Sequence, residues 1–196
     1  EGLGCIYWHM VSKLLLAIGE NLKIAEEKIC DKKILNRLRH HYFEVKTGIG
    51  ACKSPAEYGS FPFDPYSHTP IMAGVQQPGM TGQVKEDIIS RFIELGIYIE
   101  SGCIRIKPSL LKTQEFIQPD ALNNPEFNVP YLSFTYCSIP FIYLLDEKTG
   151  IDIISNQATT AHFDDYQIDN SQSSMIFNRN KNLKKIIIHL SKNSII

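Results

Sequence analysis

A proline-rich, aromatic loop carries side chains of the kind that bind sugars. Sugar hydroxyls need directional hydrogen-bond donors and acceptors, and the C–H face of a sugar ring stacks on aromatic side chains. In such a loop an aspartate or a histidine can also serve only the backbone of a turn. The cluster as a whole favours a sugar site, and its members are Asp64, Tyr66, His68, Gln76 and Gln77.

The segment PGMTGQVKED, which follows this loop, has the features of an anion site. Thr81 offers a hydroxyl and Gly82 allows close approach to the backbone just before an expected helix, whose first N–H groups have no partner within the helix. Thr81 also fits a simple N-cap of that helix, and one residue can do both. Lys85 lies too far into the helix to match a Walker-type phosphate loop.

Other titratable residues give weaker signals. His9 lies near the start of an apolar helix beside the only tryptophan, where a structural histidine is the more common case. Asp64 is the only acid of the loop that suits catalysis, because Glu86 and Asp87 are neighbours on a helix and cannot both face one site. His162, close to two aspartates, lacks a set of metal-ligand partners nearby.

The composition excludes several classes of protein. The chain has 196 residues and a net charge of −1, without the basic stripe that a nucleic-acid partner requires. Its apolar runs are too short to span a membrane. Five cysteines without a C-x-x-C pair favour free thiols in a reducing compartment over disulfides or zinc. Because the sequence begins with Glu1 and has no signal peptide, we expect a fragment of a longer chain.

Apolar periodicity divides the chain into a helical part and a β part. Helices are expected at 6–29, interrupted near Gly19 and Asn21, at 32–45, and at 81–95, with a loop at 47–80 between the last two. Asp31 suits the N-cap of the second helix, and Gly96 suits the residue that ends the third.

From residue 97 the period changes to two, which is typical of strands. Ser101-Gly102 predicts a hairpin turn, and Pro140 within a later strand indicates an edge or a bulge. The polar stretch 156–181 matches neither period. The expected fold is α+β. Its helical domain (1–96) is followed by an antiparallel sandwich or jelly-roll-like domain (97–196).

Four segments resemble the C-terminal portion of bacterial proteins related to cellobiose and chitobiose phosphorylases, which are family 94 glycoside phosphorylases. They are IYWHMVSKLLLA, YGSFPFDPYSHTP, AGVQQPGMTGQVKEDIISRFIELG and GCIRIKPSLL, and the resemblance covers about residues 3–117. It implies the last hairpins of a six-hairpin (α/α)6 barrel followed by a small β domain. It also implies that His9 and Thr81 help to bind phosphate.

This sequence departs from the phosphorylases in two places. Gln83-Val84-Lys85 replaces their run of small residues, and the long loop is not one of their motifs. In those enzymes the catalytic acid lies upstream of the matched region, so the catalytic residues are not expected in this chain.

The resemblance implies a C-terminal fragment of a cytoplasmic carbohydrate-active enzyme, or of a periplasmic one if an upstream signal peptide exists. The reaction is phosphorolysis or hydrolysis of an oligosaccharide or disaccharide, without a metal or organic cofactor and with inorganic phosphate as a candidate co-substrate. The alternative is a noncatalytic carbohydrate-binding or structural module, in which the β half does the work.

Overall fold

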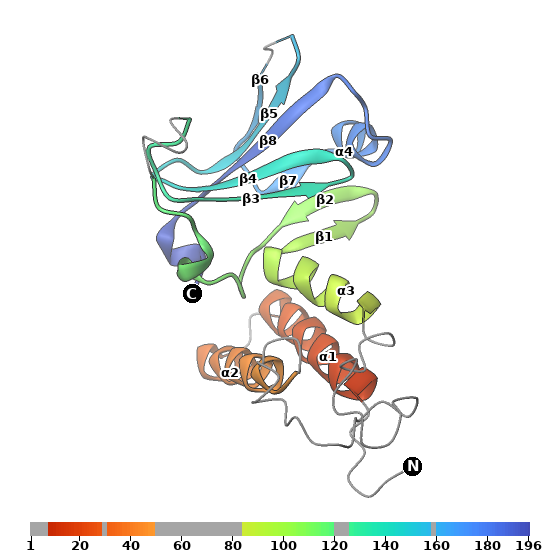
Figure 1. Cartoon of the computed structure of the whole chain (residues 1–196), viewed down its shortest axis with the longest axis vertical. Coiled ribbons are helices and arrows are strands. Elements are labelled where there is room, and N and C mark those ends of the chain that lie inside the picture. Colours follow the sequence, from red (N-terminus) through yellow and green to blue (C-terminus); the bar gives the residue numbers. More distant parts are fainter. Residues whose placement is uncertain (1–7, 29–30, 50–83, 120–125, 158–159) are drawn as a thin grey trace, which may run out of the picture. The chain divides into compact units, whose positions relative to one another are not determined.

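The computed structural model describes residues 8–28, 31–49, 84–119, 126–157 and 160–196. Helices and two β-sheets are both present, so the expectation of an α+β chain is confirmed. The chain divides into two compact units, Glu1–Arg91 and Phe92–Ile196, here called the helical unit and the β unit. Figure 1 shows the helices of the first half of the chain in red to yellow-green, and the strands, with one later helix, in green to blue.

Helix α1 (Trp8–Glu27) runs without the interruption predicted near Gly19 and Asn21. Gly19 is buried on the same face of α1 as Leu15 and Leu22, so the missing side chain permits close packing there. The exposed Asn21 donates its side-chain amide to the carbonyl of Ala17 at 2.7 Å, a bond made within the helix. Packing therefore outweighs the low helix propensity of these two residues.

Helix α2 (Lys32–Gly48) begins where the sequence predicted. The carboxylate of Asp31 accepts a hydrogen bond from the backbone N–H of Lys33 at 2.9 Å, which confirms Asp31 as the N-cap. Tyr42 is fully buried, and its hydroxyl donates to the carbonyl of Ser90 at 3.4 Å. This bond links α2 to the third helix.

Helix α3 (Val84–Leu95) contains the boundary between the two units. Its residues up to Arg91 belong to the helical unit, and its last turn belongs to the core of the β unit. Gly96 ends it with φ 71°, the left-handed conformation that the sequence predicted for this position. A Cβ atom at Gly96 would lie 2.2 Å from the carbonyl carbon of Lys107, so no other residue fits without moving the backbone.

A three-stranded sheet follows directly after α3. Its order is β1-β2-β7, and both pairings are antiparallel. The predicted hairpin is confirmed, since Ser101 and Gly102 have φ values of 51° and 79°, which suit a tight turn of this type. The bounds of the three strands are β1 (Ile97–Glu100), β2 (Cys103–Ile106) and β7 (Gln167–Ile168).

A five-stranded sheet with the order β3-β4-β8-β5-β6 forms the larger part of the β unit. The β4 and β8 strands run parallel, with Phe141 opposite Ile186, whereas the other neighbours are antiparallel. The alternating pattern of the sequence did not indicate this parallel pair. The bounds are β3 (Tyr131–Tyr136), β4 (Ile139–Leu145), β5 (Gly150–Ser155), β6 (Thr160–Phe163) and β8 (Leu183–Leu190).

The stretch 156–181, which matched neither period, contains β6, β7 and α4 (Asn170–Phe177). Asp169 caps α4 by accepting from the N–H of Gln172 at 2.7 Å. The buried hydroxyl of Ser173 accepts from the N–H of Ile104 at 3.0 Å, and so fixes α4 to β2. Two short 3-10 helices, Thr113–Glu115 and Lys192–Ser194, complete the described elements.

Pro140 was predicted to mark an edge strand or a bulge, and this prediction is wrong. It lies in β4, which has β3 on one side and β8 on the other. The strand tolerates it because the pairing of β4 with β8 begins only at Phe141, so no ladder bond to β8 requires an N–H from Pro140.

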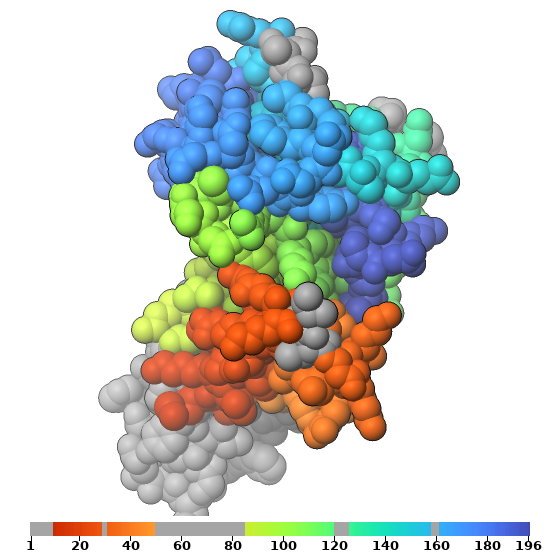
Figure 2. Space-filling model, turned by 180° about the vertical axis from the view of Figure 1, so that it is seen from behind, coloured from red at the N-terminus to blue at the C-terminus, as the bar shows by residue number. Residues whose placement is uncertain are grey.

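The core of the β unit lies between the sheets, α4 and the last turn of α3. Phe141, Ile186 and Ile188 are fully buried in it. The buried Tyr143 hydroxyl donates to the carbonyl of Leu95 at 2.5 Å, which ties β4 to α3. Seen from behind, blue C-terminal segments form much of the surface of this unit (Figure 2). No helix in the described part of the chain is both long and apolar enough to span a membrane.

Candidate functional site

The predicted sugar and phosphate site lies almost wholly outside the described residues. Of His9 only the backbone is described, within α1. The predicted residues that lie outside the described ranges are Asp64, Tyr66, His68, Gln76, Gln77, Thr81 and Gly82.

A polar cluster occupies buried and half-buried positions on α1 and on α3, the helix that follows the predicted anion site in sequence. Its members are Ser12 on α1 and Glu86, Asp87 and Ser90 on α3, here called the carboxylate cluster. Ser12, Glu86 and Ser90 are only 1%, 3% and 3% exposed. Polar side chains at such depth are normally hydrogen-bonded.

Three buried atoms of this cluster have no hydrogen-bond partner among the described residues. Glu86 Oε1 lies 3.8 Å from Nζ of Lys85, whose side chain is 78% exposed. No residue in the described ranges donates a hydrogen bond to Glu86 Oε2, and the hydroxyls of Ser12 and Ser90 are in the same position. An unpaired buried polar group costs about 1–3 kcal/mol of folding free energy, so this arrangement does not favour stability.

The environment of Asp87 favours its protonated form. Burial raises the pKa of Asp87, and the neighbouring negative charge of Glu86 raises it further. The Ser12 hydroxyl opposes this shift, although it makes no hydrogen bond of normal geometry with the carboxylate. A carboxyl group with a raised pKa keeps its proton to higher pH than a fully exposed aspartate does.

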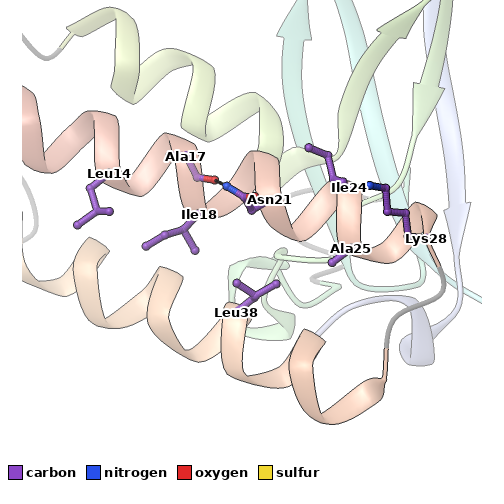
Figure 3. A pocket seen from close by; sticks show the side chains of 8 residues that line it. All are labelled: Leu14, Ala17, Ile18, Asn21, Ile24, Ala25, Lys28 and Leu38. Carbon is purple, nitrogen blue, oxygen red and sulfur yellow. Dashed lines mark hydrogen bonds between the residues drawn. The ribbon is translucent and has the colours of Figure 1, made fainter.

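An apolar groove of about 400 Å³ runs between α1 and α2. Leu14 and Ile18 point from α1 toward α2, and Leu38 points back from α2 (Figure 3). Leu14 remains 53% exposed, and Met10 and Ile34 remain 57% and 49% exposed. The groove lining comprises Leu14, Ala17, Ile18, Asn21, Ile24, Ala25, Lys28 and Leu38.

A second polar cluster crosses the five-stranded sheet of the β unit. Two histidines alternate with two aspartates over four neighbouring strands: His162 on β6, Asp152 on β5, His189 on β8 and Asp146 directly after β4. We call this row the histidine–aspartate ladder. Asp152 and His162 are direct cross-strand partners, so the register of β5 and β6 brings them together.

Hydrogen bonds join every neighbouring pair of the ladder. His189 Nδ1 lies 2.7 Å from Asp146 Oδ2, and His189 Nε2 lies 3.1 Å from Asp152 Oδ2. His162 Nδ1 lies 2.7 Å from Asp152 Oδ1. His189 is only 5% exposed, so its two bonds are shielded from water.

The ladder stabilises the ionised form of its central carboxylate. Partial burial raises the pKa of Asp152, but the hydrogen bonds from His162 and His189 and the nearby charge of Lys148 outweigh it, so the pKa is lowered overall. Lys148 Nζ lies 3.5 Å from Asp152 Oδ2.

The sequence analysis considered His162 only as a metal ligand and did not consider His189. The period-two pattern of IDIIS and KKIIIHL places Asp152 and His189 on strands, but the pairing of β5 with β8 is needed to bring them together. Nowhere in the described ranges do three or more His, Cys, Asp or Glu residues form a group that could hold a metal ion.

No protein-family model matches the sequence, and a search of curated proteins finds no significant match. A functional assignment therefore depends on the resemblance of the quoted segments and on the chemistry of the two polar clusters.

Proposed function

We propose that the chain is the C-terminal part of a carbohydrate-active enzyme, a glycoside phosphorylase or hydrolase. In this proposal the helical unit supplies the last hairpins of an (α/α)6 barrel, and the β unit is the sandwich-like domain that follows. The residues predicted to contact sugar or phosphate are His9, Tyr66, His68, Gln76, Gln77, Thr81 and Gly82, with Asp64 as the acid of the loop.

The carboxylate cluster is the observation that carries this proposal. Glu86 and Asp87 lie in the first turn of α3, immediately after the predicted phosphate residues Thr81 and Gly82. Carboxylates accept hydrogen bonds from sugar hydroxyls, so Glu86 and Asp87 suit the sugar side of the predicted site. The unpaired oxygen of Glu86 also supports a binding role, because ligand sites often retain polar groups that are unfavourable for stability.

The open groove between α1 and α2 supports the barrel part of the proposal. In a helical barrel each hairpin buries an apolar face against its neighbours, so a hairpin in isolation exposes such a face. Leu14 and Ile34, both about half exposed, are the kind of residue that a further hairpin would cover.

The proposal is tested by calorimetric titration of the chain with inorganic phosphate and with cellobiose. We expect weak binding of at least one of them, with phosphate binding reduced about tenfold or more by Thr81→Ala and cellobiose binding reduced as much by Glu86→Gln. Glu20→Gln is the matched control, because Glu20 is an exposed glutamate on α1 outside the carboxylate cluster. Equal loss in the control, or no binding by the unsubstituted chain, would contradict the proposal.

The chain alone is expected to show no turnover of aryl glycosides, because the resemblance assigns the catalytic acid to an upstream segment. Measurable and reproducible hydrolysis by the purified chain would show that this expectation is wrong. Phosphate-dependent cleavage of a β-linked disaccharide by a longer chain that includes the upstream segment would favour the phosphorylase over the hydrolase.

A noncatalytic carbohydrate-binding module is the second candidate, and the separate hydrophobic core of the β unit favours it. This core joins the sheets to α4 and to the last turn of α3 without requiring α1 or α2. If residues 92–196 bind cellobiose as tightly as the whole chain does, the β unit is the binding module. If binding needs residues 1–91, the enzyme proposal is favoured.

A further inference from the structure

The histidine–aspartate ladder has a geometry that determines where its protons lie. Both ring nitrogens of His189 face a carboxylate oxygen, at 2.7 Å on the Asp146 side and 3.1 Å on the Asp152 side. An ionised carboxylate only accepts hydrogen bonds, so each nitrogen must donate. A neutral imidazole has one N–H and can satisfy only one of the two bonds.

The alternative would place the additional proton on a carboxyl group. The bonds from His162 and His189 and the nearby Lys148 charge hold the pKa of Asp152 below its usual range, so Asp152 is the poorer place for a proton. Asp146 Oδ2 lies at the short distance typical of a charge-assisted bond, while its Oδ1 has no partner in the described ranges.

We propose that His189 is held as an imidazolium bridging Asp146 and Asp152, and that this proton locks the centre of the five-stranded sheet. The bridge joins the end of β4, β8 and β5, which are consecutive in the sheet. Loss of the proton leaves one carboxylate oxygen facing a nitrogen lone pair inside a buried site. The two lone pairs repel each other, which opposes the pairing of the strands at this point. The ladder is thus a pH-sensitive lock within the β unit.

The charged groups around His189 come from every strand that packs beside it. Asp146 follows β4, Asp152 and the nearby Lys148 belong to β5 and the turn before it, and His162 on β6 contacts Asp152. His162 in turn faces the fully exposed Asp164 at 3.4 Å. The Tyr166 hydroxyl donates to the backbone carbonyl of His189 at 2.7 Å, which fixes the strand without changing the charge.

The sign of the pH effect follows from proton counting. The bridge needs both ring protons of His189, because each ring nitrogen faces a carboxylate oxygen. Rising pH can only remove one of these protons, so the lock should weaken as pH rises.

Nitrogen-15 NMR of the histidine rings in the full chain tests the proton directly. At pH 7 we expect both ring nitrogens of His189 to give the chemical shifts and N–H couplings of protonated nitrogen. A bare nitrogen on either side of His189 at this pH overturns the proposal. This measurement needs no substitution, so a failure to fold cannot obscure it.

The variant Asp146→Asn tests the lock. An asparagine of the same size can donate its amide to Nδ1, so a neutral His189 satisfies both neighbours. We expect backbone amide exchange in β5 and β8, corrected for intrinsic rates, to lose protection with rising pH in the unsubstituted chain but not in the variant. Asp165→Asn, an exposed aspartate outside the ladder, should behave as the unsubstituted chain does. An equal pH dependence in all three proteins overturns the proposal.

Discussion

The helical unit and the β unit each hold a carboxylate away from most of the solvent, but these two carboxylates differ in their hydrogen bonds. Glu86 of the helical unit is 3% exposed and has an oxygen with no partner in the described ranges. Asp152 of the β unit uses both oxygens, one for each histidine. A satisfied network contributes to stability and rigidity, whereas an unsatisfied one costs stability and is retained for another reason. Within the ladder Asp146 Oδ1 also lacks a partner in the described ranges, so the contrast is between Glu86 and Asp152. It supports the binding role proposed for Glu86 and a structural role for Asp152.

The largest expected effect on stability is the difference between a core position of the β unit and a groove position of the helical unit. Phe141→Ala empties a fully buried position in the β unit and should lower its free energy of unfolding by about 3–5 kcal/mol. Leu14→Ala in the groove, where the side chain is 53% exposed, should change stability by less than about 0.5 kcal/mol. Urea unfolding followed by circular dichroism measures both. A large loss for Leu14→Ala would show that the groove is already covered.

The next largest effect on stability is expected for substitutions of Asp152 and Glu86, the two carboxylates compared above. Asp152→Ala leaves His189 without its second acceptor and should cost about 3 kcal/mol. Glu86→Met keeps the volume but removes the unpaired oxygen, and should raise stability by about 1 kcal/mol. Urea unfolding measures these changes, with Trp8 fluorescence as a probe in α1. If Glu86→Met is destabilising, Glu86 has a structural role, and the contrast between the units is lost.

Lowering the pH should change the stability of the two units in opposite directions. The pKa of Asp87 is raised in the folded state by burial and by Glu86, so its stabilising contribution to the helical unit is present below about pH 4 and is lost as pH rises through its folded value. The pKa of Asp152 is lowered despite its burial, so its contribution is present above about pH 4 and is lost as pH falls through its folded value. Thermal unfolding between pH 3 and 7 checks this, with Asp87→Asn and Asp152→Asn each removing one of the two effects.

The smallest expected effect concerns the exposed end of the ladder. Lys148 has a 64% exposed side chain and lies 3.5 Å from Asp152, so Lys148→Ala should cost less than about 1 kcal/mol. The loss should shrink further in 0.5 M salt, since exposed ion pairs are screened. A larger loss that salt does not change would mean that Lys148 is part of the buried network.

Local signals in the sequence were sufficient for the elements that depend on near neighbours. The Asp31 cap, the Ser101-Gly102 turn and the left-handed Gly96 are each determined by one or two residue types. The interruption predicted at Gly19 was wrong because burial of that helix face, a tertiary effect, decides the outcome. The predicted loop site stays a prediction, since its residues lie outside the described ranges.

The ladder could not be predicted because strand order, not residue spacing, creates it. His189 and Asp146 are 43 positions apart in the chain, and only the parallel pairing of β4 with β8 brings them together. Period-two alternation shows that these residues lie on strands but contains no information on which strands pair. Glu86 of α3 was visible as a residue type, whereas its burial is a tertiary effect that residue types alone do not show.

The place of β8 in the larger sheet has a consequence for synthesis on the ribosome. In chain order β8 follows all the other described strands, yet in space it lies between β4 and β5. The hairpins β3–β4 and β5–β6 are therefore synthesised first. The edge of β4 and the edge of β5 that pair with β8 stay unpaired until Leu183–Leu190 has left the exit tunnel. A nascent chain halted before Leu183 exposes two unpaired strand edges that can pair with other chains. Loss of this single segment removes a central strand of the sheet and not an edge strand.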